Sequence, residues 1–217
     1  MFRENRANFP GTEFEETGVT RPTIQSFMKT LRSFLLLSCA FLAIAGARAT
    51  TVIPPTFDEL VNEAELIFQG AVTDVRSQWT GEGAERRIVS DITFQVEDAL
   101  KGTPGESYTI RMLGGTVDGQ TLRVSDAPTF KVGDRDILFV ENNGRQFIPL
   151  VGIMHGRFHV QQEQDGKESI ARDNGAPLSD LAKLGKDENA ASAGKALSTT
   201  DFKAAIREKL SQAPAVK

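Results

Sequence analysis

The sequence predicts an all-β domain, an antiparallel barrel or sandwich, with a short helix before it and another helix after it. Three observations lead to this fold class. Short runs alternate between apolar and polar residues, closely spaced turns rich in Gly, Asn and Asp separate them, and no helical pattern between them is long enough to connect parallel strands. We expect the β domain over residues 50–172.

The domain should begin with a short helix over residues 56–64, after an extended lead-in that Pro54 and Pro55 keep out of helical geometry. Thr56 can cap this helix, and Glu59 completes a capping box three residues later. The apolar residues of this segment recur at helical spacing, so one face of the helix should pack against the sheet.

The clearest strand pattern covers residues 87–96, where every second residue from Ile88 to Val96 shares one face. Asn143-Gly144 predicts a tight hairpin between residues 137–140 and 147–150. Other strands are expected over residues 66–75, 107–113, 120–124, 135–140, 157–160 and 167–171.

Beyond the β domain, the composition shifts to Ala, Gly, Ser, Lys and Asp, which predicts a flexible linker over residues 173–198. A helix is expected over residues 199–211, with Phe202, Ala205, Ile206 and Leu210 in one apolar stripe. The sequence leaves open whether this helix packs on the β domain.

Residues 28–49 have the three parts of a secretory signal peptide. Lys29 and Arg32 precede an apolar run over residues 34–45, and Ala47-Arg48-Ala49 fits a cleavage site, so the mature chain should begin at Thr50. The apolar run is shorter than the roughly 20 residues that span a bilayer. We therefore expect an exported protein, periplasmic or secreted, with no stable transmembrane segment after processing.

Two alternatives concern the same region. Cys39, the single cysteine, ends a partial lipobox, so the protein could instead be a lipoprotein anchored through Cys39. Residues 1–27 are polar and precede the signal peptide, which indicates that they are untranslated or disordered and that Met28 is the true start. A long polar leader is the alternative.

Composition and motifs argue against several functions. The net charge of −4 opposes nonspecific binding to nucleic acid or anionic lipid. His155 and His159 would lie about 13 Å apart on a strand, too far to bind one metal ion. The acidic pairs Asp134/Asp136 and Glu97/Asp98 resemble solvated turn or edge charges, and Trp79 a rim residue that closes the core. We therefore predict no catalytic, cofactor-binding or metal-binding residues.

Five segments resemble a group of uncharacterised bacterial exported domains that occur alone or ahead of matrixin-type metalloproteases. They are LIFQGAV (66–72), ITFQVEDALKG (92–102), LGG (113–115), FKVGD (130–134) and ILFV (137–140). The pattern is also similar to the OB-like barrel of tissue-inhibitor-of-metalloproteinase and netrin-like modules. The resemblance, over residues 57–160, implies an OB-like antiparallel barrel. Those inhibitors chelate zinc with an N-terminal cysteine, which the expected start at Thr50 lacks.

The sequence favours an exported, non-enzymatic binding or accessory module, because OB-like barrels present loops and one sheet face to partners. Its partner would be another exported protein or a glycan. The alternative is a hydrolase or protease modulator whose site the sequence does not reveal, with His155 and His159 among its candidate residues.

Overall fold

A computed structural model describes residues 53–212 and begins with the predicted short helix, α2 (Phe57–Glu63). The hydroxyl of Thr56 accepts a hydrogen bond from the backbone N–H of Glu59 (3.3 Å), and the Glu59 carboxylate accepts one from the N–H of Thr56 (2.7 Å). These reciprocal bonds confirm the capping box and satisfy two donors that the first helical turn would otherwise leave free. Leu60 and Val61 point into the core.

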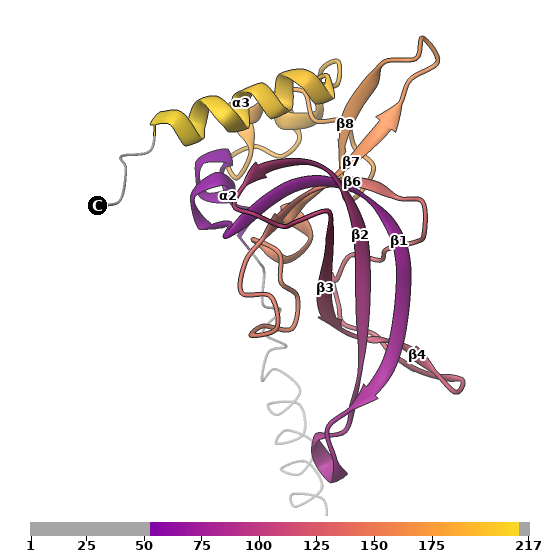
Figure 1. Cartoon of the computed structure of the whole chain (residues 1–217). Coiled ribbons are helices and arrows are strands. Elements are labelled where there is room, and N and C mark those ends of the chain that lie inside the picture. Colours follow the sequence, from indigo (N-terminus) through magenta and orange to yellow (C-terminus); the bar gives the residue numbers. More distant parts are fainter. Residues whose placement is uncertain (1–52, 213–217) are drawn as a thin grey trace, which may run out of the picture. The chain divides into compact units, whose positions relative to one another are not determined.

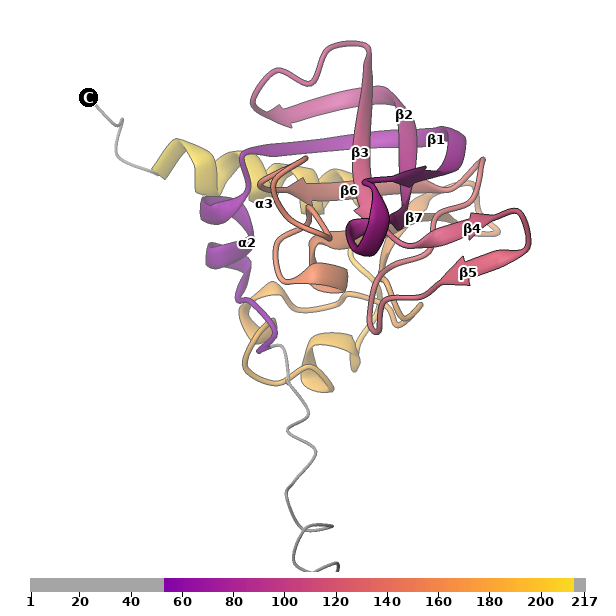
Figure 2. The same ribbon diagram turned by 90° about the horizontal axis from the view of Figure 1, so that it is seen from below.

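The mostly β architecture is confirmed as one six-stranded antiparallel sheet and one small hairpin (Figures 1 and 2). The strand order in the large sheet is β3-β2-β1-β6-β7-β8. Its strands are β1 (Leu66–Thr80), β2 (Arg87–Lys101), β3 (Ser107–Leu113), β6 (Arg135–Val140), β7 (Arg157–Gln162) and β8 (Glu168–Arg172). The hairpin consists of β4 (Gly115–Val117) and β5 (Gln120–Leu122). Because β6 pairs only with residues 66–71 of β1, the distal β1–β2 ribbon extends beyond the other strands.

Irregular segments cover both outer strands of the large sheet. Along β3, Asn143 accepts a hydrogen bond from the N–H of Arg111 (3.1 Å), and the carbonyl of Phe147 accepts one from Leu113 N (2.7 Å). Along β8, the carbonyl of Ile170 accepts a hydrogen bond from the N–H of Leu178, and the N–H of Ile170 donates one to the carbonyl of Leu197. These contacts protect the strand edges from pairing with other chains. No β3–β8 pairing closes the sheet within residues 53–212, so barrel closure is not shown.

Hydrophobic clusters cover both faces of the central strands. Successive residues of a strand point to opposite faces, so Ile67 and Phe68 enter different clusters. One cluster contains Ile67 and Phe202 and lies against the helices, and the other contains Phe68 and Phe94. Burial on both faces explains why β6 carries an unbroken apolar run.

The turn at Asn143-Gly144 is only partly as predicted. β6 ends at Val140, and the one ladder contact across the turn is an isolated bridge between Val140 and Leu150. The predicted strand over residues 147–150 does not form, because this segment closes the edge of β3 through Phe147. The other predicted strands form, with β1, β2 and β7 longer and β5 shorter than expected.

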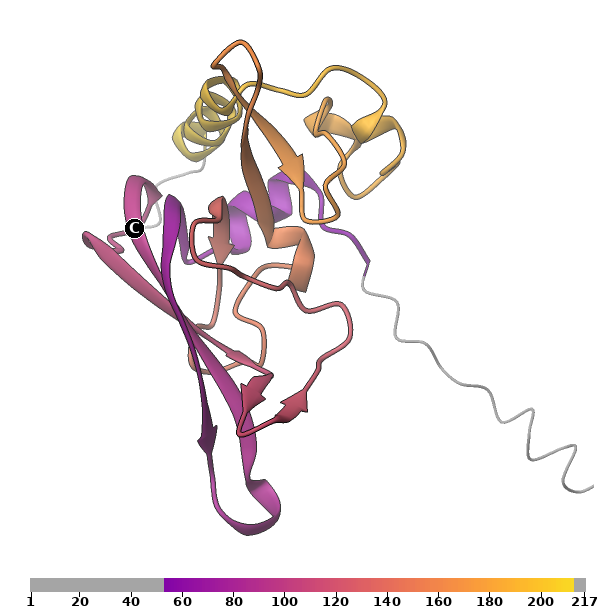
Figure 3. The same ribbon diagram turned by 90° about the vertical axis from the view of Figure 1, so that its right-hand side faces the viewer.

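The prediction of a flexible linker over residues 173–198 is wrong. Leu178, Leu184 and Ala191 are buried in the cluster beneath the helices, and the segment contains two short 3-10 turns, Leu181–Lys183 and Ala190–Ser192. Its backbone also pairs with β8. The small polar residues that suggested a tether instead form tight turns between a few buried apolar anchors. Figure 3 shows this segment beside the last helix, above the sheet.

The last helix, α3 (Thr199–Gln212), packs on the sheet, which settles the alternative that the sequence left open. Phe202 and Ile206 are fully buried, and Phe202 lies 5.0 Å, ring centre to ring centre, from Phe158. Arg207 and Lys203 pair with Asp98 of β2. Within residues 53–212, neither helix has the length and apolar character needed to cross a membrane.

Candidate functional site

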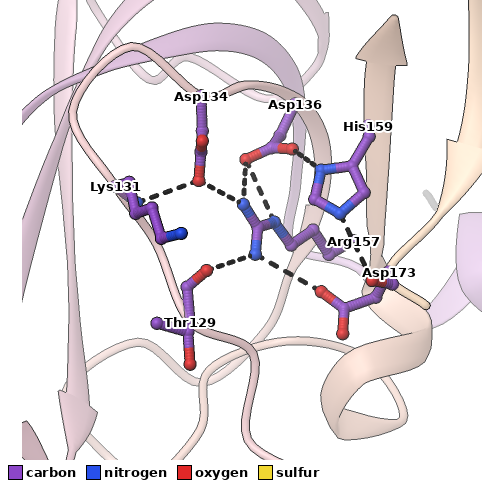
Figure 4. Close-up of polar contacts among 7 residues, drawn as sticks. All are labelled: Thr129, Lys131, Asp134, Asp136, Arg157, His159 and Asp173. Atoms are coloured by element: carbon purple, nitrogen blue, oxygen red, sulfur yellow. Dashed lines mark hydrogen bonds and ion pairs between the residues drawn. The ribbon is translucent and has the colours of Figure 1, made fainter. Parts of the chain in front are cut away.

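The most concentrated polar cluster surrounds Arg157, the first residue of β7, whose side chain is 2% exposed. Each guanidinium N–H group has an acceptor (Figure 4). Nε bonds Asp136 (3.1 Å), and Nη2 contacts Asp134 (2.8 Å) and Asp136 (3.0 Å). Nη1 bonds the carbonyl of Thr129 (2.8 Å) and the carboxylate of Asp173 (3.3 Å). Arg157 therefore has no free donor for a ligand.

The second basic group in this cluster is His159, two residues further along β7. Its Nδ1 lies 2.8 Å from Oδ1 of Asp136, a carboxylate with no solvent exposure, and its Nε2 lies 3.3 Å from the carbonyl of Asp173. The hydrogen bond to Asp136 raises the pKa of His159, and burial partly opposes this rise. Both ring nitrogens are therefore engaged within the protein.

This cluster holds the loop that leads into β6. The carbonyl of Thr129 bonds Arg157, and the backbone N–H of Lys131 donates to Asp134 (2.9 Å). Between these two anchors, the Phe130 ring packs under the guanidinium of Arg157 at 4.0 Å, which is a cation–π contact. The ionic cluster thus fixes both the backbone and the aromatic side chain of this segment.

The fixed loop forms one wall of a groove of about 470 Å³. The other walls are the distal parts of β1 to β3 and the β4–β5 hairpin, which lies beside them in Figure 2. Its side chains are aliphatic or hydroxyl-bearing apart from Met112, Phe130 and the single charged residue, Arg123. The lining includes Val75, Ser77, Ser90, Thr121, Arg123 and Phe130.

The groove exists in this form because β4 approaches the ribbon very closely. A Cβ atom on Gly115 would lie 2.4 Å from the hydroxyl oxygens of both Ser77 and Ser90. Gly115 also has a φ of 134°, which side chains disfavour. The two serine hydroxyls lie 2.8 Å apart, and Ser90 donates to the carbonyl of Gly114 (2.7 Å). Gly114 and Gly115 therefore provide the backbone freedom that this close approach requires.

The two predicted acidic pairs are not simple solvated charges. Asp136 is fully buried, because Arg157 and His159 reach it from β7, a neighbouring strand. Glu97 pairs with Arg135, and this pairing lowers the pKa of Glu97. Arg157 and Asp173 were missed as site residues. No local pattern marks them, since their role depends on strands that meet only after folding.

Only one of the two histidines lies on a strand, contrary to the expectation for His155. His155 is in a 3-10 turn (Ile153–Gly156), where burial lowers its pKa, and His159 is in β7. Within residues 53–212, no three His, Cys, Asp or Glu side chains are grouped to hold a metal ion. Trp79 is half-buried and has the guanidinium of Arg86 4.2 Å above its ring. The predicted cleavage residues Ala49 and Thr50, and Cys39, lie outside the described residues.

Comparison of the chain with family models, curated proteins and solved structures finds no match in any of the three.

Proposed function

We propose that this protein is an exported, non-enzymatic binding or accessory module, and that the groove between the β1–β3 face and the β4–β5 hairpin is its ligand site. The observation that carries the proposal is this groove, whose loop wall is held in place by the saturated Arg157 cluster. Its volume of about 470 Å³ is in the range typical of ligand sites. We further propose that the sheet is the curved wall of an OB-like barrel, a fold that presents one sheet face and its loops to ligands.

The lining of the groove favours a polypeptide over a glycan. Aliphatic and hydroxyl groups dominate, and Val75 exposes 36% of its surface at this site. Sugars are commonly held by stacking on exposed aromatic rings, but Phe130, the aromatic side chain in the lining, is only 7% exposed and is covered by Arg157. The partner we expect is a segment of another exported protein with apolar side chains. A carboxylate on that segment could pair with Arg123.

The alternative function, a hydrolase or protease modulator, receives less support from the geometry. A general base needs a nitrogen free to accept a proton from a nucleophile or water. Both nitrogens of His159 are engaged, and among the described residues that line the hollow beside His155 there is no Ser, Thr or Cys side chain to serve as a nucleophile. The double substitution His155→Ala/His159→Ala would abolish hydrolysis of peptide or ester substrates if this alternative held.

The test places a photo-crosslinking amino acid at Thr121, which is exposed and lines the groove, and at Lys186 as an exposed control away from it. The protein is expressed with its full leader, so that crosslinking occurs in its natural compartment. We expect one defined adduct from position 121 and none from position 186. Equal adducts at both positions, or a glycan as the adduct, would contradict the proposal.

A further inference from the structure

A second hollow, whose lining shares only Ala127 with that of the groove, lies beside the Arg157 cluster. Its volume is about 300 Å³. Its apolar wall consists of the partly exposed Pro55, Ala127 and Met154, behind which Leu60, Phe158 and Leu184 are buried. The polar lining residues are Asp126, His155, Arg157, Arg172, Asp173, Asn174 and Glu188. This volume is at the lower end of the range typical of ligand sites, so the space fits a small ligand.

The acceptors on the wall of this cavity are only partly used. The carboxylate of Asp126 makes no hydrogen bond or ion pair within residues 53–212. Asp173 accepts from Arg157 through Oδ1, which leaves Oδ2 without a donor among the described residues. Both oxygens of Asp126 and one of Asp173 are therefore free among the described residues, and both residues line a space that is large enough for a cationic group.

A positively charged hydrogen-bond donor, Arg172, lines the same cavity as these two carboxylates. Arg172 is mostly buried, and its Nη1 and Nη2 donate to Glu188 and Ser192. Its Nε–H has no acceptor among the described residues. Burial lowers the pKa of His155, so this imidazole is neutral near pH 7 and offers one donor and one acceptor. Unpaired carboxylate oxygens and an unpaired guanidinium N–H thus lie next to apolar walls. This is the pattern expected for a site that binds a zwitterion with a hydrophobic part.

We propose that this cavity binds a free α-amino acid with an aliphatic side chain. The ammonium group of the ligand meets Asp126 and Asp173, its carboxylate accepts from Arg172, and its side chain packs on the partly exposed Pro55, Ala127 and Met154. Leucine, with nine non-hydrogen atoms, matches the available space. This site is independent of the groove, so the proposed function and this inference can fail separately.

The first experiment is calorimetric titration of the processed chain with three probes. Leucine has both charges, leucinamide keeps only the ammonium group, and N-acetylleucine keeps only the carboxylate. We expect saturable binding of leucine, with each single-charge analogue at least about tenfold weaker, because each loses one charge-assisted contact. Binding of either analogue as tight as leucine, or no binding of any probe at about 10 mM, would overturn the proposal, since a site of this kind should bind below about 1 mM.

A matched pair of variants locates the site. Asp126 and Asp118 are both exposed and both have a positive φ, 60° and 50°, a conformation that asparagine tolerates. Asp118 lies in the turn of the β4–β5 hairpin, away from the cavity. We expect Asp126→Asn to weaken leucine binding about tenfold and Asp118→Asn to leave it unchanged. Equal effects of the two substitutions would refute the assignment. A thermal unfolding curve for each variant confirms that the fold is retained.

Discussion

The substitution Arg157→Met tests whether the buried ionic cluster holds the loop wall of the groove. Methionine fills a similar volume but removes the donors to Asp134, Asp136, Asp173 and the carbonyl of Thr129. Asp136 has no solvent exposure, so after the substitution its charge would be compensated by His159 alone. Removing one partner of a buried ion pair typically costs about 3–5 kcal/mol.

The matched control is Arg111→Met. Arg111 also makes a two-pronged contact with a carboxylate, that of Asp91, at 2.7 and 2.9 Å, but its side chain is 53% exposed. Exposed pairs contribute about 0–1 kcal/mol, because water screens them and holding the side chains costs entropy. The same chemical change is thus made at two ion pairs that differ mainly in burial.

Chemical denaturation with urea, followed by circular dichroism, measures both variants. We expect Arg157→Met to lower the free energy of unfolding by about 3–5 kcal/mol and Tm by about 10 °C, with at most about 1 kcal/mol lost in Arg111→Met. If the free energy of unfolding falls by the same amount in both variants, the buried cluster stabilises the fold no more than an exposed ion pair does, and the reasoning is wrong.

Three further predictions follow from the structure. The hydrogen bond to Asp136 raises the pKa of His159, so the stability that this bond contributes is complete below about pH 6.5 and is lost as pH rises through the folded-state pKa. His159→Gln should therefore flatten the fall in the free energy of unfolding with rising pH. Burial lowers the pKa of His155, so His155→Gln should instead reduce the loss of stability as pH falls. Leu178→Ala should lower the free energy of unfolding, measured by urea denaturation, by about 2–5 kcal/mol. Cleavage of the wild-type chain within residues 173–198 by a low concentration of protease under native conditions would contradict the packing of this segment. Gly115→Ala should cost about 1–3 kcal/mol and change the methyl NMR shifts of the groove, while Gly119→Ala, with open space around it, should cost about 1 kcal/mol; equal losses would refute the close approach of β4.

The candidate site was much less predictable than the strands around it. The Asp134/Asp136 pair looked like turn charges because, in sequence, its neighbours are Gly133 and the start of a strand. Its true environment comes from Arg157, 21 residues beyond Asp136 in the chain, which β7 places beside β6. No periodic pattern in the sequence links residues that far apart in the chain. The sequence therefore predicted neither the burial of Asp136 nor the contacts by which Arg157 holds the loop before β6.

The amino-acid sequence by itself determined the local elements. Alternation specified β2 and β3, the Thr56–Glu59 capping box set the start of α2, and an apolar stripe specified α3, because each depends on residues within a few positions of one another. Tertiary structure alone decided that residues 173–198 pack through Leu178 and Leu184, and that a groove and a cavity form beside the Arg157 cluster. Burial and ion pairing depend on partners distant in the chain, and only the folded arrangement of strands brings those partners together.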